Sequence, residues 1–191
     1  MNTIWNFFKS QGFTDEGIAG VMGNLYAESR LDPKNLQDSY SKKFGLTDIQ
    51  YTQQVDNGTY TNFVSDKAGY GLAQWTSSDR KEAFLIYVQG QKKSIGDLDV
   101  QLNFLMIELK QNYLQLLKLL QTTSSVKEAS DAFMTQFERP KDQSEAAKTK
   151  RRNYSLNYYK GGIRTMKYNK SNPPMVCMMT NSTCYKGTST M

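Results

Sequence analysis

Histidine is absent from the 191-residue chain, and its absence excludes several kinds of active site. A serine or cysteine nucleophile has no histidine base here, and a zinc ion has no imidazole ligand. Two cysteines occur, Cys177 and Cys184, so a four-thiolate zinc site cannot form within one chain. Carboxylates, lysine, tyrosine and serine remain for catalysis, and we expect neither a metal nor a cofactor.

Long apolar runs are missing as well. The sequence has no stretch of about 18 consecutive apolar residues, so we expect no membrane span. Residues 1–13 lack the basic start and the continuous apolar run of a secretion signal. A hydrophobic content of 38% is typical of a globular protein, and the length suits one domain followed by a tail.

The net charge of +6 favours polyanionic partners such as nucleic acid or an anionic cell wall. Basic residues are grouped with aromatic residues between positions 148 and 160. That segment is typical of the solvated face of a helix, so we expect no nucleic-acid partner. A strongly salt-dependent shift of DNA mobility would contradict this expectation.

Residues 14–33 predict a helix that ends in a carboxylate. Thr14 is a suitable N-cap, and Asp32-Pro33 is a stop signal. Glu28 lies in the last turn, at the margin of an apolar face with helical spacing that is formed by Ile18, Val21, Met22 and Leu25. Gly20 and Gly23 inside this helix predict the close approach of another element.

Glu28 is therefore a candidate general acid. Partial burial and the negative end of the helix dipole both favour the protonated carboxyl group, which a general acid requires. The alternative is a solvated surface glutamate, or one that pairs with a nearby arginine such as Arg30.

Residues 69–76, GYGLAQWT, form a second candidate segment. Its two glycines allow a sharp turn close to a ligand. Gln74 offers an amide for hydroxyl and acetamido groups, and Trp75 offers an aromatic face on which a sugar can stack. Glycines are also common in the turn before a helix, where they have no role in ligand binding.

The rest of the chain predicts further helices and a small β lobe. The predicted helices cover residues 3–11, 78–88, 97–113, 114–120, 125–137 and 142–159. Residues 55–60, VDNGTY, contain an Asn-Gly turn signal between β-forming residues, which predicts a small hairpin or an irregular β lobe. Gly161-Gly162 is expected to close the last helix and to separate a domain of residues 1–160 from a segment of residues 161–191.

Two motifs in this order, AESRLDP at residues 27–33 and GYGLAQW at residues 69–75, resemble the phage tail lysozyme family of peptidoglycan-degrading domains. FERP at residues 137–140 also resembles a late segment of that family. The likeness covers roughly residues 3–160 and extends more faintly to goose-type lysozymes and lytic transglycosylases. It implies an α+β fold, a mainly helical lysozyme-like domain with a small β or irregular lobe after the catalytic helix.

The resemblance also implies roles for single residues. Glu28 would be the catalytic acid, while the second motif would supply the substrate-binding residues Tyr70, Gly71, Gln74 and Trp75. The implied reaction is cleavage of the β-1,4 bond between N-acetylmuramic acid and N-acetylglucosamine. Arg30 and Asp32 are expected to be structural.

The fate of the cleaved sugar stays open at this stage. A second carboxylate about 6.5–9.5 Å from the acid would activate water. The candidates are Asp66 first, and then Asp38, Asp48 and Asp56. Without such a group, Glu28 would act alone and the muramyl 6-hydroxyl would close an anhydro ring, as in a transglycosylase. A non-catalytic domain that binds peptidoglycan is a further alternative.

The segment from about Met166 resembles the opening of a zinc-dependent amidase domain of multidomain endolysins, without the histidines that would bind zinc. The implied partners are cell-wall peptidoglycan and either a following amidase domain or a phage tail assembly. The implied place of action is the cell wall, for a virion protein or a phage-encoded lysin. Cys177 and Cys184 form a disulfide in an oxidising compartment or remain free thiols.

Overall fold

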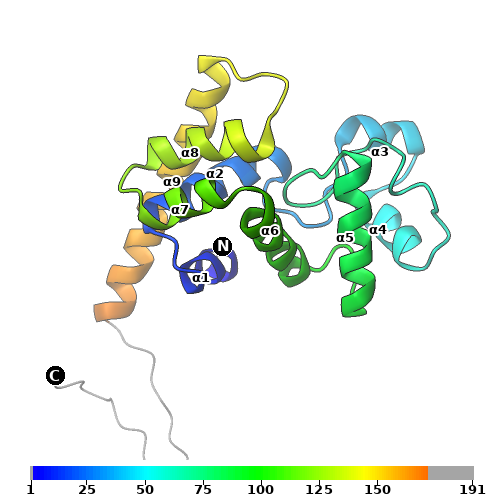
Figure 1. Cartoon of the computed structure of the whole chain (residues 1–191), viewed down its shortest axis with the longest axis horizontal. Helices are drawn as coiled ribbons and strands as arrows, with labels where there is room; N and C mark the ends of the chain where they lie inside the picture. The colour runs from blue at the N-terminus through cyan, green and yellow to red at the C-terminus, as the bar shows by residue number, and fades with distance from the viewer. Residues whose placement is uncertain (1, 172–191) are drawn as a thin grey trace, which may run out of the picture.

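The computed structural model describes the backbone of residues 2–171 and the side chains of residues 3–162 (Figure 1). This part of the chain is mainly helical, as expected. Its α-helices are α1 (Asn2–Ser10), α2 (Asp15–Ser29), α3 (Asp38–Phe44), α4 (Asp48–Asp56), α5 (Ser78–Gln91), α6 (Leu98–Asn112), α7 (Leu114–Thr122), α8 (Val126–Phe133) and α9 (Glu145–Ser171), with a π-helical turn η1 (Met134–Glu138) after α8. Within this range, no helix combines the length and apolar character needed to cross a membrane.

Helix α2 is the buried centre of one group of helices. It contacts α1, α7, α8 and α9. Its N-cap is Thr14, whose hydroxyl accepts a hydrogen bond from the backbone N–H of Gly17 at 3.0 Å, as predicted. The close approach predicted for Gly20 and Gly23 is also confirmed. A Cβ atom at Gly20 would lie 2.5 Å from Ala129 Cβ, and one at Gly23 would lie 2.1 Å from Ser155 Oγ.

Helices α3, α4 and α5 form a second group, which lies beyond α6 in Figure 1. The loops beside α6 are held by Gln101, whose amide is fully buried. Its Nε2 donates to the carbonyl of Pro33 at 2.6 Å, and its Oε1 accepts from the backbone N–H of Leu72 at 2.8 Å. One side chain of α6 thus fixes both motifs that the sequence had singled out.

The hairpin predicted at residues 55–60 is wrong. Residues up to Asp56 belong to α4, which starts with a capping box formed by Thr47 and Gln50. Asn57 and Gly58 end this helix, and Gly58 has a left-handed φ of +77°. An Asn-Gly pair serves a helix C-terminus as well as a hairpin, and the sequence pattern does not separate the two.

No strand forms among residues 2–171, so the expected α+β class is not confirmed, and the segment after α2 is an irregular lobe that carries α3 and α4. Two isolated bridges, Leu36 with Tyr70 and Tyr70 with Trp75, are the β pairing found in this range. The lobe is packed around aromatic side chains instead. Tyr70 contacts Tyr51 and Phe63, with ring centroids 5.4 and 5.8 Å apart.

The predicted end of the last helix at Gly161-Gly162 is also wrong, because α9 continues to Ser171. A Cβ atom at Gly162 would lie 2.4 Å from the ring of Trp5, so this glycine allows close contact between α1 and α9. The boundary between residues 160 and 161 stays a prediction. Cys177, Cys184 and most of the amidase-like segment lie outside the described residues.

Candidate active site

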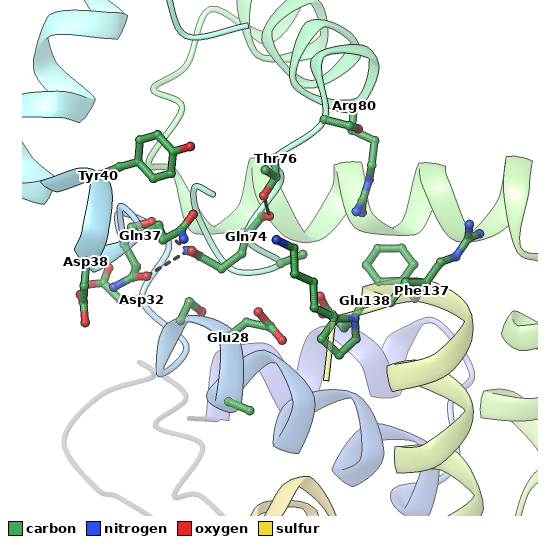
Figure 2. A pocket seen from close by; sticks show the side chains of 18 of the residues that line it. Glu28, Asp32, Gln37, Asp38, Tyr40, Gln74, Thr76, Arg80, Phe137 and Glu138 are labelled. Atoms are coloured by element: carbon green, nitrogen blue, oxygen red, sulfur yellow. Dashed lines mark hydrogen bonds between the residues drawn. The ribbon is translucent and has the colours of Figure 1, made fainter. Parts of the chain in front are cut away.

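A cleft of about 1390 Å³ opens beside the C-terminal end of α2 (Figure 2). Its walls are formed by the end of α2, by parts of residues 30–48 and 67–80, by Tyr113 and by residues 137–141. Glu28 and Glu138 lie near its centre in Figure 2, with Asp38 and Tyr40 towards one end. The cleft is larger than the roughly 300–1,000 Å³ that is usual for small-molecule sites.

The end of α2 is shaped by two residues with left-handed backbone conformations. Arg30 and Leu31 have φ values of 56° and 64°, so the helix ends before the expected stop at Asp32-Pro33. Ser29 donates from its hydroxyl to the carbonyl of Leu72 at 3.0 Å. This bond ties the end of α2, next to Glu28, to the GYGLAQW segment.

Glu28 lines the cleft, and its side chain is 20% exposed. Its Oε1 accepts a hydrogen bond from Arg151 Nη2 at 2.5 Å. The partner is therefore not the neighbouring Arg30 but a buried arginine of α9, 123 residues away. The two side chains form an ion pair between α2 and α9 at the edge of the cleft.

Glu138, at the end of η1, is a cleft residue that the sequence analysis missed. Its Oε1 is buried and has no hydrogen-bond partner among the described residues. Burial raises the pKa of the Glu138 carboxyl well above its ordinary value, and the charge of Glu28 adds to this rise, while Arg80 and Arg151 oppose it. The residue was visible as part of FERP, but nothing local in the sequence indicates which residues surround it.

Gln74 lines the cleft, as expected for a substrate-binding residue. Its Nε2 donates to Asn35 Oδ1 at 2.9 Å and to the carbonyls of Asn35 and Gly71 at 3.1 Å. These bonds hold the side chain against the wall of the cleft (Figure 2). Gln74 itself has a left-handed φ of 46°.

Trp75 does not border the cleft. The indole is fully buried, stacks on Phe84 with ring centroids 5.0 Å apart, and donates from Nε1 to Glu108 Oε2 at 2.8 Å. The role of a sugar-stacking surface predicted for Trp75 is therefore not compatible with its position. The tryptophan packs in the core and fixes Glu108.

Tyr70 and Gly71 are likewise structural. Tyr70 is fully buried, and its hydroxyl lies 2.6 Å from Thr52 Oγ1. Gly71 has a φ of +73°, and a Cβ atom there would lie 2.6 Å from Gln101 Oε1. The glycine is required by the turn and by the packing of Gln101, and neither Tyr70 nor Gly71 lines the cleft.

Asp66, the first candidate for a second carboxylate, lies away from the cleft lining. Its side chain is 3% exposed and forms an ion pair with Lys81, with Nζ 2.6 Å from Oδ1. It also accepts hydrogen bonds from Tyr51, Tyr60 and the backbone N–H of Ala68. These partners occupy the carboxylate, so the structure gives Asp66 a place in the packing of the lobe and not in the site.

The other candidate carboxylates divide into two groups. Asp38 and Asp48 line the cleft together with Asp32, and burial raises the pKa of the Asp48 carboxyl. Asp56 instead accepts bonds from the hydroxyl of Ser94 and the backbone N–H of Ile95. Among the described residues, no group of three or more Asp, Glu or Cys side chains is arranged to hold a metal ion.

Aromatic and basic residues form the opposite end of the cleft. Arg80 binds Glu108 through Nε and Nη2 at 2.6 and 2.8 Å, and its guanidinium lies 4.9 Å from the ring centre of Phe137. Arg139 lies 5.5 Å from the ring centre of Tyr113, a cleft residue. Tyr40 and Tyr113 line the cleft and offer the aromatic surface that Trp75 does not.

The helical fold and the carboxylate-bearing cleft at the end of a buried helix are consistent with a lysozyme-like domain. The model of the family described as phage tail lysozyme matches residues 1–161, and the chain belongs to this family. Membership identifies it in general terms as a lysozyme-like peptidoglycan hydrolase that is phage-associated and acts on the bacterial cell wall.

Proposed function

We propose that the chain is a muramidase, a glycosidase that cleaves the β-1,4 bond between N-acetylmuramic acid and N-acetylglucosamine, with Glu28 as general acid. Glu28 donates its proton to the glycosidic oxygen while the bond from that oxygen to the muramyl anomeric carbon breaks. The bonding electrons leave with the oxygen. Water then adds to the anomeric carbon and loses a proton to a carboxylate of the site.

The observation that carries this proposal is the position of Glu28. A side chain that is 20% exposed, at the end of a buried helix, faces a cleft large enough for several sugar units. The hydrogen bond of Ser29 to Leu72 holds the end of α2 against the GYGLAQW segment, which favours the fixed position that a proton donor requires. A protein that only binds glycan has no need of a shielded carboxylate in its groove.

The biological setting is part of the proposal. The substrate is cell-wall peptidoglycan, and the chain acts on it as part of a virion or as a phage-encoded endolysin. A following amidase domain or a tail assembly would bring the cleft to the wall. The cationic surface of the chain, with its net charge of +6, favours contact with anionic wall polymers.

The test compares the unaltered protein with Glu28→Gln on purified Gram-positive cell walls. Gln keeps the size of the side chain but cannot donate a proton as a carboxylic acid, so we expect turbidity loss to slow by about 100-fold or more. Glu82→Gln is the matched control, because Glu82 is exposed on α5 and away from the cleft lining. Both variants should still sediment with the walls. Equal lysis by Glu28→Gln and the unaltered protein would contradict the proposal. If none of the three proteins lyses the walls although all of them bind, the chain is a non-catalytic binding domain and the proposal is wrong.

Mass spectrometry of the released fragments separates the two possible reactions. Hydrolysis leaves a reducing N-acetylmuramic acid end, whereas a transglycosylase leaves a 1,6-anhydro end that is lighter by one water. We expect reducing ends.

A further inference from the structure

Two carboxylates that line the cleft, Glu28 and Glu138, interact with the buried Arg151 beside it. Glu28 comes from α2, Glu138 from η1 and Arg151 from α9. Arg151 contacts Glu28 directly, and both Glu28 and Arg151 act electrostatically on Glu138. Figure 2 shows the side chains of Glu28 and Glu138 next to one another.

The charges in this cluster do not balance when both carboxyl groups are ionised. The other charged groups that act on Glu138 are Arg80 and Glu108, and these two neutralise each other through two hydrogen bonds. Arg151 then faces two carboxylates, so Glu28, Glu138 and Arg151 together carry a net charge of −1 when both carboxyl groups are ionised. One proton shared between Glu28 and Glu138 removes that charge.

Two atoms of the cluster are left without partners and are complementary. Arg151 Nη1 is a buried donor and Glu138 Oε1 is a buried acceptor, and neither has a hydrogen-bond partner among the described residues. Buried polar atoms are usually paired, because an unpaired one costs about 1–3 kcal/mol. A hydrogen bond between Arg151 and Glu138 would satisfy both atoms and would release Glu28.

The backbone around Glu138 is unusual in a way that fits a functional position. The turn η1 is a π-helix closed by a bond from Arg139 N to the carbonyl of Met134 at 2.8 Å, and Arg139 has a left-handed φ of 47°. Short π-helical turns within helical segments are frequent at functional sites. Here the turn brings Glu138 to the cleft at the end of the helical segment that α8 begins.

We propose that Glu28 and Glu138 share one proton, and that Arg151 pairs with whichever of the two is ionised. This inference rests on the proposed function of Glu28. In the arrangement described above, Arg151 pairs with Glu28 and the proton resides on Glu138. When Arg151 pairs with Glu138, the proton resides on Glu28, which is then ready to donate it to the glycosidic oxygen. Glu138 is thus a positioning residue that acts through Glu28.

The pH profile of the lysis rate tests this proposal. In Glu138→Gln, residue 138 is always neutral, so Arg151 stays with Glu28 and Glu28 loses its proton at lower pH. We expect the alkaline limb of the profile to move to lower pH by about one unit or more. The rate at neutral pH should fall by about tenfold or more and recover in acid, with wall binding unchanged.

Two further variants sharpen the test. Arg151→Met removes the cation that favours ionised Glu28, so its alkaline limb should move to higher pH, opposite to that of Glu138→Gln. Glu138→Asp restores a titratable carboxyl group and should recover part of the rate at neutral pH. Glu82→Gln is again the control for the loss of one carboxylate. A Glu138→Gln profile that coincides with that of the unaltered protein, or a folded variant that is equally impaired at every pH, would overturn the proposal.

A measurement without substrate keeps this proposal separate from the proposed function. The pH dependence of the carboxyl carbon resonance of Glu138 is followed by NMR in the unaltered protein and in Glu28→Gln. Loss of the Glu28 charge, and release of Arg151 towards Glu138, should move the midpoint for Glu138 to lower pH. An unchanged midpoint would refute the shared proton even in an active enzyme, whereas a shifted midpoint in a protein without lytic activity would refute the proposed function alone.

Discussion

At the scale of single residues, Glu138 makes the stability of the protein depend on pH. Burial raises the pKa of its carboxyl group in the folded state well above 4.5, its ordinary value, which applies in the unfolded chain. The folded state therefore holds this proton more tightly than the unfolded state. The resulting stabilisation is complete below the ordinary value and is lost as pH rises through the raised value.

Glu138→Gln should remove this dependence, because a neutral amide does not titrate. We expect the variant and the unaltered protein to have similar stability in acid, and the variant to become the more stable of the two as pH rises. Urea denaturation between about pH 4 and about pH 9 measures the difference. Parallel curves across that range would show that Glu138 titrates normally. Glu138→Gln would then be more stable but less active than the unaltered protein, a trade-off that is common for substitutions at functional sites.

The residues of the site differ in how far the sequence reveals them. Glu28 was found because helical spacing within one short segment places it beside an apolar face. Its partner Arg151 was not found, because it is 123 residues away and its segment has the composition of a solvated helix face. Trp75 shows the opposite error. A residue type that often binds sugars is used here to fill the core, and this choice depends on the residues that surround it in space.

At the scale of elements, the packing of α2 depends on glycines that leave no room for a methyl group. A Cβ atom at Gly23 would lie 2.5 Å from the backbone nitrogen of Ser155, so Gly23→Ala must move α9 away from α2. We expect a loss of stability of about 1–3 kcal/mol or more. Gly90→Ala in α5 is the matched control, because its Cβ would have no atom within 4 Å, and it should stabilise the protein by up to about 1 kcal/mol. Thermal melting of both variants decides, and equal melting temperatures would contradict the packing argument.

Helix starts were easier to predict than the ends of helices. Asp97 and Ser125 cap α6 and α8 through bonds from the backbone N–H groups of Val100 and Glu128, and these signals lie within a few residues of each other. Gly161-Gly162 and Asn57-Gly58 are ambiguous, because glycine ends a helix, forms a turn or allows close packing. At Gly161-Gly162 the glycine allows close packing, because Gly162 lies against the ring of Trp5.

At the scale of the whole molecule, the cleft lies between two differently built parts. One wall is the end of α2, which is held by α8 and α9. The other includes the irregular chain before α5, which packs around aromatic side chains and a few buried polar groups. Gln101 of α6 holds two segments of that irregular chain by binding both Pro33 and Leu72, and Ser29 at the end of α2 binds Leu72 as well. Correct folding of the irregular part therefore shapes one wall of the cleft, while Glu28, the candidate general acid, lies on the other wall.

The ion pair of Asp66 and Lys81 is the centre of that irregular part, and it offers the last prediction. Asp66→Asn leaves the fully buried Lys81 ammonium without its counter-charge, which should cost about 3–5 kcal/mol of stability. At a temperature where the variant stays folded, its lysis rate should be close to that of the unaltered protein, since Asp66 is outside the cleft lining. Asp66→Asn/Lys81→Met removes both charges and should recover much of the lost stability. Urea denaturation and wall lysis, measured side by side, separate this structural role from a catalytic one, because normal stability with lost lysis would make Asp66 the second carboxylate after all.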